Sequence, residues 1–230
     1  MVRIMWTRCM DEDGRGTLAY GRGDKASKAL VQKKRMQGGC SMAKLYMMRH
    51  GQTLFNVLKR KQGWCDSPLT ATGIEQARAA GEWLRGHGIA FDHVYSSTSE
   101  RACDTCELVV PGVPYVREKG LKEWNFGTFE GLTEDTNPPL PYGDFYVPFG
   151  GEGEMEFRAR LMDTLKHIMD RPDHECVLAV SHGAACAQVL RALDYDYRSS
   201  GKRLGNCCIV EYDYSPSLGL SVCDIYNPND

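Results

Sequence analysis

Short apolar runs alternate with amphipathic stretches along the chain from about residue 44 onward. The runs Leu45–Met48 and Val177–Val180 are too short for helices and end at glycine-containing corners, a pattern that predicts buried strands. Further strands are expected at His93–Ser97, around Tyr115–Val116, and near residues 207–213 and 220–226.

Helical spacing fills the segments between these strands. After Pro68, apolar or small residues recur every three or four positions; Thr70 or Thr72 can cap this helix, and Gly86 and Gly88 end it. The same spacing predicts helices over Thr98–Val110, Glu154–Met169 and 184–193. Alternating strands and helices predict an α/β fold with three layers, in which helices cover both faces of a mostly parallel central sheet.

The segment from Asn125 to Gly151 interrupts this alternation. It contains four prolines and five aromatic residues beyond Phe126, and it ends in Gly150-Gly151. This composition predicts a structured loop over the sheet edge, a lid-like insert at about residues 125–151. The glycine pair can act as a hinge, so we expect the loop to close on a substrate.

Residues 1–43 lack sustained periodicity and carry nine Lys or Arg against four Asp or Glu. We expect a disordered or non-native extension with one weak helix near Lys25–Met36, preceding a single domain over residues 44–230. A nucleic-acid-binding or membrane-tethering arm is the alternative. Gln37-Gly38-Gly39 can be encoded by a bacterial ribosome-binding sequence, so we hypothesise that translation starts at Met42. A nucleotide sequence whose codons at these positions do not contain such a binding sequence would contradict the hypothesis.

Composition narrows the functional classes. Net charge is −2 over 230 residues, and the part after residue 43 carries 19 basic against 26 acidic residues, which argues against nucleic acid as a partner. No apolar run is long enough to span a bilayer and the first residues lack a signal-peptide core, so we expect a cytoplasmic protein without a membrane partner. The ten cysteines are expected to be reduced thiols.

Two of the predicted strands end in the same way. Arg49-His50-Gly51 follows the first strand, and Ser181-His182-Gly183 follows a later one. The carboxyl ends of parallel strands meet at one edge of a sheet, where ligands bind in open α/β folds. The two histidines are therefore expected to share one site.

Further motifs follow the first corner in a characteristic order. These are Asn56, Gln62-Gly63, Asp66-Ser67-Pro68-Leu69-Thr70, Ser96-Ser97 with Arg101, and Leu121-Lys122-Glu123 with Gly127 and Glu130-Gly131. With the two corners, they make the chain resemble the histidine phosphatase superfamily, in its phosphoglycerate-mutase-like branch 1. The resemblance covers Lys44 to about Tyr214 and leaves residues 1–43 outside.

The resemblance implies a phosphoryl transfer in which His50 is the nucleophile and a phosphohistidine forms. Arg49 and Arg101 are the expected clamps, because guanidinium groups match phosphate geometry and stay charged. His182 is expected to donate a hydrogen bond to a transferring oxygen. Glu123 is the candidate general acid, since burial beside aromatic residues raises a carboxyl pKa toward the working pH.

Substrate or phosphate binding is expected from a wider set of residues. With Arg49 and Arg101 it comprises Thr53, Asn56, Gln62, Gly63 and Gly183. Glu130 is the competing carboxylate and is expected to be structural. The scheme needs no metal and no cofactor. The other histidines (His87, His93, His167 and His174) show neither i, i+4 spacing nor carboxylate partners that indicate a metal site.

The lid favours a phosphatase over a mutase. A phosphoglycerate mutase must hold a second anionic group, yet no Lys or Arg lies between Lys122 and Arg158. Lys59, Arg60 and Lys61 are the exception, because they follow the first corner and can reach an anion. The expected substrate is a small organic phosphate monoester whose organic part stacks on Tyr142, Phe145, Tyr146 or Phe149.

Three other functions remain open or are disfavoured. A phosphoglycerate mutase-type transfer is the first alternative, and a non-catalytic phosphate-sensing protein on the same scaffold is the second. A Rossmann-type nucleotide enzyme is disfavoured, because Gly14-Arg15-Gly16 follows no strand. The sequence does not identify the physiological substrate or the oligomeric state.

Overall fold

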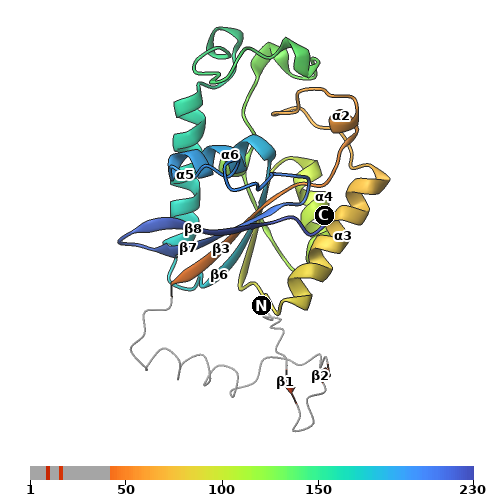
Figure 1. Cartoon of the computed structure of the whole chain (residues 1–230), viewed down its shortest axis with the longest axis vertical. Helices are drawn as coiled ribbons and strands as arrows, with labels where there is room; N and C mark the ends of the chain where they lie inside the picture. Colours follow the sequence, from red (N-terminus) through yellow and green to blue (C-terminus); the bar gives the residue numbers. More distant parts are fainter. Residues whose placement is uncertain (1–8, 11–15, 18–41) are drawn as a thin grey trace.

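The computed structural model describes residues 42–230, together with β1 (Cys9–Met10) and β2 (Gly16–Thr17), which pair antiparallel (Figure 1). The extension over residues 1–43 and its helix near Lys25–Met36 lie almost wholly outside the described residues. Both stay predictions, as does the domain boundary that follows from them.

A six-stranded sheet forms the centre of the described chain. Its strands are β3 (Ala43–Arg49), β4 (His93–Ser97), β5 (Val116–Glu118), β6 (Cys176–Ser181), β7 (Ile209–Ser215) and β8 (Gly219–Tyr226). Their order is β5-β4-β6-β3-β7-β8. The first four are mutually parallel, whereas β7 and β8 join antiparallel because only a short turn connects them. The α/β prediction is confirmed.

Four helices cover the two faces of the sheet, as the three-layer prediction requires (Figure 1). They are α3 (Ala71–Gly86), α4 (Glu100–Val109), α5 (Glu154–Met169) and α6 (Gly183–Ala192). Successive strand residues point to opposite faces: Met47 packs with Phe157 of α5, and Met48 packs with Ala77 of α3. Thr70, one of the two expected caps, caps α3. Within residues 42–230, no helix is long and apolar enough to cross a membrane.

The insert at residues 125–151 is held together by an aromatic cluster. It contains the short helices η2 (Gly127–Phe129), η3 (Glu134–Thr136) and η4 (Val147–Phe149). Tyr146 is fully buried at its centre, with ring contacts to Phe126 and Phe129. A Cβ at Gly151 would lie 2.5 Å from the Asn125 carbonyl oxygen, so this glycine permits close packing. Hinge motion at Gly150-Gly151 stays a prediction.

Two short helices connect the sheet to the loops above it. These are α2 (Leu54–Val57) after β3, and η1 (Lys119–Leu121) after β5. The Thr53 side chain caps α2 by accepting from the Asn56 amide, and Asn56 Oδ1 accepts from the Thr53 amide. The chain after β3 is thereby turned sharply, which leaves His50 at the carboxyl edge of the sheet.

Candidate active site

His50 lies directly beyond the end of β3, buried at the carboxyl edge. Its Nδ1 lies 2.8 Å from the Gly51 carbonyl oxygen. A carbonyl oxygen only accepts hydrogen bonds, so Nδ1 carries the proton and Nε2 keeps its lone pair. Burial, followed by the charges of Arg101 and Arg49, lowers the pKa of His50 well below its ordinary value. The ring is therefore neutral and oriented as a nitrogen nucleophile requires.

His182 precedes α6, and its ring centroid lies 5.3 Å from that of His50. Arg101 Nη2 donates to His182 Nδ1 at 3.0 Å, so the remaining N–H, on Nε2, donates to Ser97 Oγ at 2.8 Å. Burial and the Arg101 charge lower the pKa of His182. Because both nitrogens have protein partners, donation to a phosphoryl oxygen requires exchange of one contact. That role stays a prediction.

Arg101 lies in the first turn of α4 and is completely buried. Its two terminal nitrogens contact five groups: the carbonyl oxygens of Gln62 (3.1 Å), Gly63 (2.9 Å) and Cys65 (2.9 Å), the Asp66 carboxylate (3.0 Å) and His182 Nδ1. Arg101 Nε is buried and has no hydrogen-bond partner among the described residues. The guanidinium is thus fixed rigidly, with one donor unused.

Arg49, whose charge also acts on His50, shows the same feature. Its Nη1 donates to the Leu204 carbonyl oxygen at 2.8 Å, and within residues 42–230 its buried Nε has no partner. A Cβ at Gly183 would lie 3.1 Å from Arg49 Nε, so glycine there leaves room for this guanidinium. An unpaired buried N–H is costly. Two such donors beside a histidine pair form a ready binding site for an anion.

Glu123 is buried and points toward the same region. Its Oε1 accepts from the Trp124 amide and its Oε2 from the Ala184 amide in the first turn of α6, both at 2.9 Å. Burial raises the pKa of Glu123, and this effect exceeds the opposite effects of the two amides and the arginines. The expected raised pKa is thus supported, and the group is suited to carry a proton.

Glu130, the competing carboxylate, organises the loop beneath Arg101. Its two oxygens accept from the backbone amides of Gly63 (3.0 Å), Trp64 (2.7 Å), Cys65 (3.1 Å) and Phe126 (3.1 Å). Four amide donors leave this carboxylate little capacity for proton transfer. The geometry agrees with the structural role expected for Glu130.

Comparison with known proteins identifies the family. Residues 45–221 match the family model described as histidine phosphatase superfamily (branch 1). The chain belongs to this superfamily. It is 33% identical over 194 residues to the probable phosphoglycerate mutase GpmB of Proteus mirabilis, covering 78% of this chain and 89% of the relative. It is 34% identical over 185 residues to a broad-specificity phosphatase of Saccharomyces cerevisiae, with coverages of 76% and 80%.

Solved structures give the same result for the fold. A phosphoglycerate mutase from Bacillus anthracis superposes with a TM-score of 0.71 at 27% identity, covering 80% of this chain and 92% of its own. A phosphoserine phosphatase from Entamoeba histolytica, solved with 3-phosphoglyceric acid, superposes with a TM-score of 0.66 at 28% identity, with coverages of 80% and 96%. The relatives of this chain thus include both mutases and phosphatases.

The other predicted binding residues lie near His50 but have protein partners. Thr53 Oγ1 donates to Gln62 Oε1 at 2.7 Å, and Gln62 Nε2 donates to Ser67 Oγ at 3.0 Å. The Gly63 amide is taken by Glu130 and its carbonyl by Arg101. Asn56 Oδ1 accepts from the Thr53 amide at 3.1 Å. These contacts shape the loop, and direct phosphate contact by these residues stays a prediction.

Three residues outside the predicted set position the site. Asp66 anchors Arg101, and Ser97 accepts the hydrogen bond from His182 Nε2. Both lie in motifs that the sequence analysis noted without assigning them a role. Asn206 Nδ2 donates to the His50 carbonyl oxygen and to Asn56 Oδ1, each at 3.2 Å. No sequence signal indicates Asn206, because it lies on a loop 156 residues after His50.

The structure corrects two expectations about substrate contacts. Stacking of a substrate on Tyr146 is wrong, because that ring is fully buried in the insert; Phe145 and Phe149 are partly exposed. The second expectation was that the basic residues after the first corner can reach an anion. Two of them, Arg60 and Lys61, already donate to protein groups. Lys61 Nζ donates to the Thr133 carbonyl oxygen at 3.1 Å and to Thr136 Oγ1, and Arg60 Nη1 donates to the Gly131 carbonyl oxygen at 2.8 Å.

A third correction concerns the histidines outside the candidate site. The expectation that they lack carboxylate partners is wrong for His93 and His174, which both contact Asp173. The sequence pattern does not indicate this cluster, because 81 positions separate the two histidines. They lie close together because β4 pairs in parallel with β6. His87 instead stacks on Trp83.

Proposed function

We propose that this protein is a metal-independent phosphatase that hydrolyses a small organic phosphate monoester through a phosphohistidine intermediate. The observation that carries the proposal is the buried His50 with a free Nε2, between two guanidinium groups whose Nε donors are unpaired. A phosphoryl group placed there meets a nucleophile and two cationic donors together. Each role in the reaction is filled by a side chain, so the scheme requires no metal.

The first step transfers the phosphoryl group to the protein. The His50 Nε2 lone pair attacks phosphorus, and the bond between phosphorus and the ester oxygen breaks. Glu123 gives its proton to the departing oxygen, so that an alcohol leaves rather than an alkoxide. Arg49 and Arg101 stabilise the charge on the phosphoryl oxygens.

The second step regenerates the enzyme. The Glu123 carboxylate formed in the first step accepts a proton from a water molecule, and the water oxygen attacks phosphorus. The N–P bond breaks, its electron pair returns to His50 Nε2, and inorganic phosphate is released. Glu123 ends protonated, as it began, so the cycle balances.

The surroundings of the site support hydrolysis over mutase chemistry. The insert carries no Lys or Arg. Lys61 Nζ donates to the Thr133 carbonyl oxygen and to Thr136 Oγ1, and Arg60 Nη1 donates to the Gly131 carbonyl oxygen. Lys122 Nζ lies 4.5 Å from the centroid of the Trp64 ring. Few basic groups therefore remain for a second anion, and the exposed faces of Phe145 and Phe149 suit an organic group.

A phosphoglycerate mutase-type transfer is the second candidate. The relatives favour it, because proteins named as phosphoglycerate mutases match at 33% identity, close to the 34% of the yeast phosphatase. Both activities use a phosphohistidine and differ in whether water or a second substrate oxygen receives the phosphoryl group. The scarcity of basic groups around the insert supports hydrolysis.

We place the activity in the cytoplasm. The eight described cysteines are all free thiols, and five of them are buried. Such thiols suit a reducing compartment.

The test compares hydrolysis with transfer in excess EDTA. Phosphate release from a panel of monoesters is measured beside interconversion of 2- and 3-phosphoglycerate. We expect hydrolysis that EDTA leaves intact and no efficient interconversion. Efficient interconversion with little phosphate release would establish the mutase instead. Loss of activity in EDTA while the fold is retained would contradict the metal-independent scheme, and tight phosphate binding without turnover would indicate the sensing protein.

Replacing Glu123 with glutamine is expected to slow hydrolysis of an alkyl phosphate by about 10²- to 10⁴-fold, because a poor leaving group needs the proton. An aryl phosphate with an acidic phenol should lose far less, since its oxyanion leaves unaided. The ratio of the two losses, measured as kcat, checks the role. Equal losses for both substrates would indicate that Glu123 acts only through the packing of α6.

The pH dependence of kcat/KM is expected to be bell-shaped. His50 must be neutral, and its lowered pKa moves the acid limb below 6.5, the ordinary value. Glu123 must be protonated to act as the acid. Its raised pKa places the alkaline limb above pH 4.5, the ordinary pKa of a glutamate. Rates with an alkyl phosphate across pH 4–9 check both limbs, and Glu123→Gln should abolish the alkaline one. An acid limb at or above pH 6.5 would contradict the assignment of His50.

A further inference from the structure

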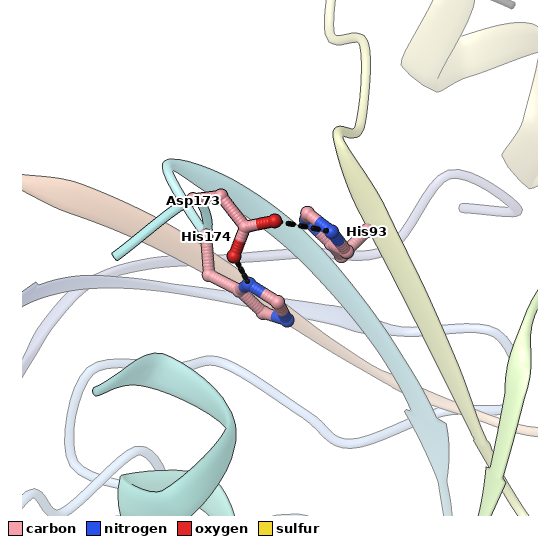
Figure 2. A group of neighbouring side chains, drawn as sticks. All are labelled: His93, Asp173 and His174. Carbon is pink, nitrogen blue, oxygen red and sulfur yellow. Dashed lines mark hydrogen bonds and ion pairs between the residues drawn. The ribbon is translucent and has the colours of Figure 1, made fainter. Parts of the chain in front are cut away.

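A second cluster of titratable side chains lies at the sheet edge opposite the catalytic residues. His93 begins β4, whereas Ser97, which contacts His182, ends the same strand. Asp173 and His174 lie in the connection between α5 and β6. Because His93 pairs with Val177 in register, this connection reaches the His93 ring. We call His93, Asp173 and His174 the histidine–aspartate cluster (Figure 2).

Asp173 bridges the two rings of the cluster. One carboxylate oxygen lies 3.3 Å from His93 Nε2, and the other lies 2.9 Å from His174 Nδ1 (Figure 2). One possible ligand atom from each residue lies within 4.8 Å of the others. Two imidazole nitrogens and a carboxylate oxygen are a ligand set that suits zinc, with water completing the coordination.

The opposite nitrogen of each ring is already held by a protein group. His93 Nδ1 lies 3.1 Å from the Asp92 carboxylate, and His174 Nε2 lies 2.8 Å from the Tyr95 hydroxyl. The second Asp92 oxygen accepts from the Glu175 and Cys176 amides, each at 2.8 Å, which ties the connection to β4. Such outer contacts orient the histidine ligands of metal sites and fix their tautomers. They leave His93 Nε2 and His174 Nδ1 directed at Asp173.

We propose that the histidine–aspartate cluster binds one divalent zinc ion through His93 Nε2, His174 Nδ1 and the Asp173 carboxylate. The ion would cross-link the start of β4 to the connection before β6, and it would stabilise the fold without entering catalysis. The proposal rests on these residues alone and does not depend on the proposed phosphatase activity.

Binding requires one adjustment of the cluster. The two rings are stacked, with centroids 3.7 Å apart and planes 10° from parallel, so their in-plane lone pairs run side by side. To share one ion, one ring must turn. His93, with 26% of its side chain exposed, has the freedom to do so, whereas His174, at 2%, stays fixed.

The test measures zinc binding by the full chain after removal of metals with EDTA and exchange into metal-free buffer. Zinc at about a hundredfold excess over its dissociation constant is expected to raise the Tm by about 5 °C or more. His93→Ala and Asp173→Asn, at exposed or half-buried positions, should abolish this shift. His87→Ala, an exposed histidine outside the cluster, should retain it.

Thiols are the rival zinc ligands, and cobalt distinguishes them. Thiolate-bound Co²⁺ absorbs strongly in the near ultraviolet, whereas Co²⁺ bound by nitrogen and oxygen does not. We expect a cobalt complex without that absorption, lost in His93→Ala. A thiolate spectrum, an unchanged Tm with zinc, or a full zinc shift in His93→Ala or Asp173→Asn would each overturn the proposal.

Discussion

Replacing His50 with alanine is expected to lower the rate of phosphate ester hydrolysis by about 10⁴- to 10⁶-fold, which is the scale seen when a catalytic nucleophile is removed. The loss follows because no other described side chain between Arg49 and Arg101 offers a free nitrogen lone pair. His182 uses both of its nitrogens on Arg101 and Ser97. Steady-state hydrolysis of an aryl phosphate in EDTA gives the measurement.

Two controls separate loss of chemistry from loss of fold. His87→Ala removes an exposed histidine and should leave the rate unchanged, and circular dichroism of His50→Ala should match the native protein. Rapid quenching of the native enzyme with labelled substrate should trap an acid-labile phosphoryl group, and His50→Ala should trap none. A variant that keeps a tenth of the native rate would exclude His50 as the nucleophile.

Replacing Arg101 with lysine is expected to lower the free energy of unfolding by about 3–5 kcal/mol, because several buried polar groups lose their hydrogen-bond donor at about 1–3 kcal/mol each. Lysine keeps the positive charge but has a single nitrogen, whereas the two terminal nitrogens of the Arg101 guanidinium contact five groups. Several buried carbonyl oxygens would lose their hydrogen-bond donor. The Asp66 carboxylate would lose the guanidinium that it contacts. Urea denaturation measures the change.

Arg85→Lys is the matched control for this substitution. Arg85 is exposed and makes one hydrogen bond, 3.2 Å long, to the Val109 carbonyl oxygen, so its replacement should cost less than about 1 kcal/mol. Arg101→Lys should also raise KM for phosphate esters, since the clamp is displaced with its loop. Equal stability of the two variants would show that the Arg101 network contributes little to the fold.

The sequence alone determined the secondary-structure elements and the main chemical groups of this protein. His93–Ser97 and Glu154–Met169 were predicted with the observed bounds, because apolar periodicity and turn residues are local properties of the chain. The two histidine corners were predicted to meet for a related reason. Parallel strands place their carboxyl ends at one edge, and His50 and His182 do lie there together.

Only the tertiary structure decided how these groups are held and charged. The five contacts of Arg101, the Asn206 contact with the His50 carbonyl and the cluster of His93 with Asp173 all join residues far apart in sequence. The raised pKa of Glu123 follows from its burial, which depends on how the insert and α6 pack around it. Burial and long-range pairing depend on the whole fold, and no local pattern of residues encodes them.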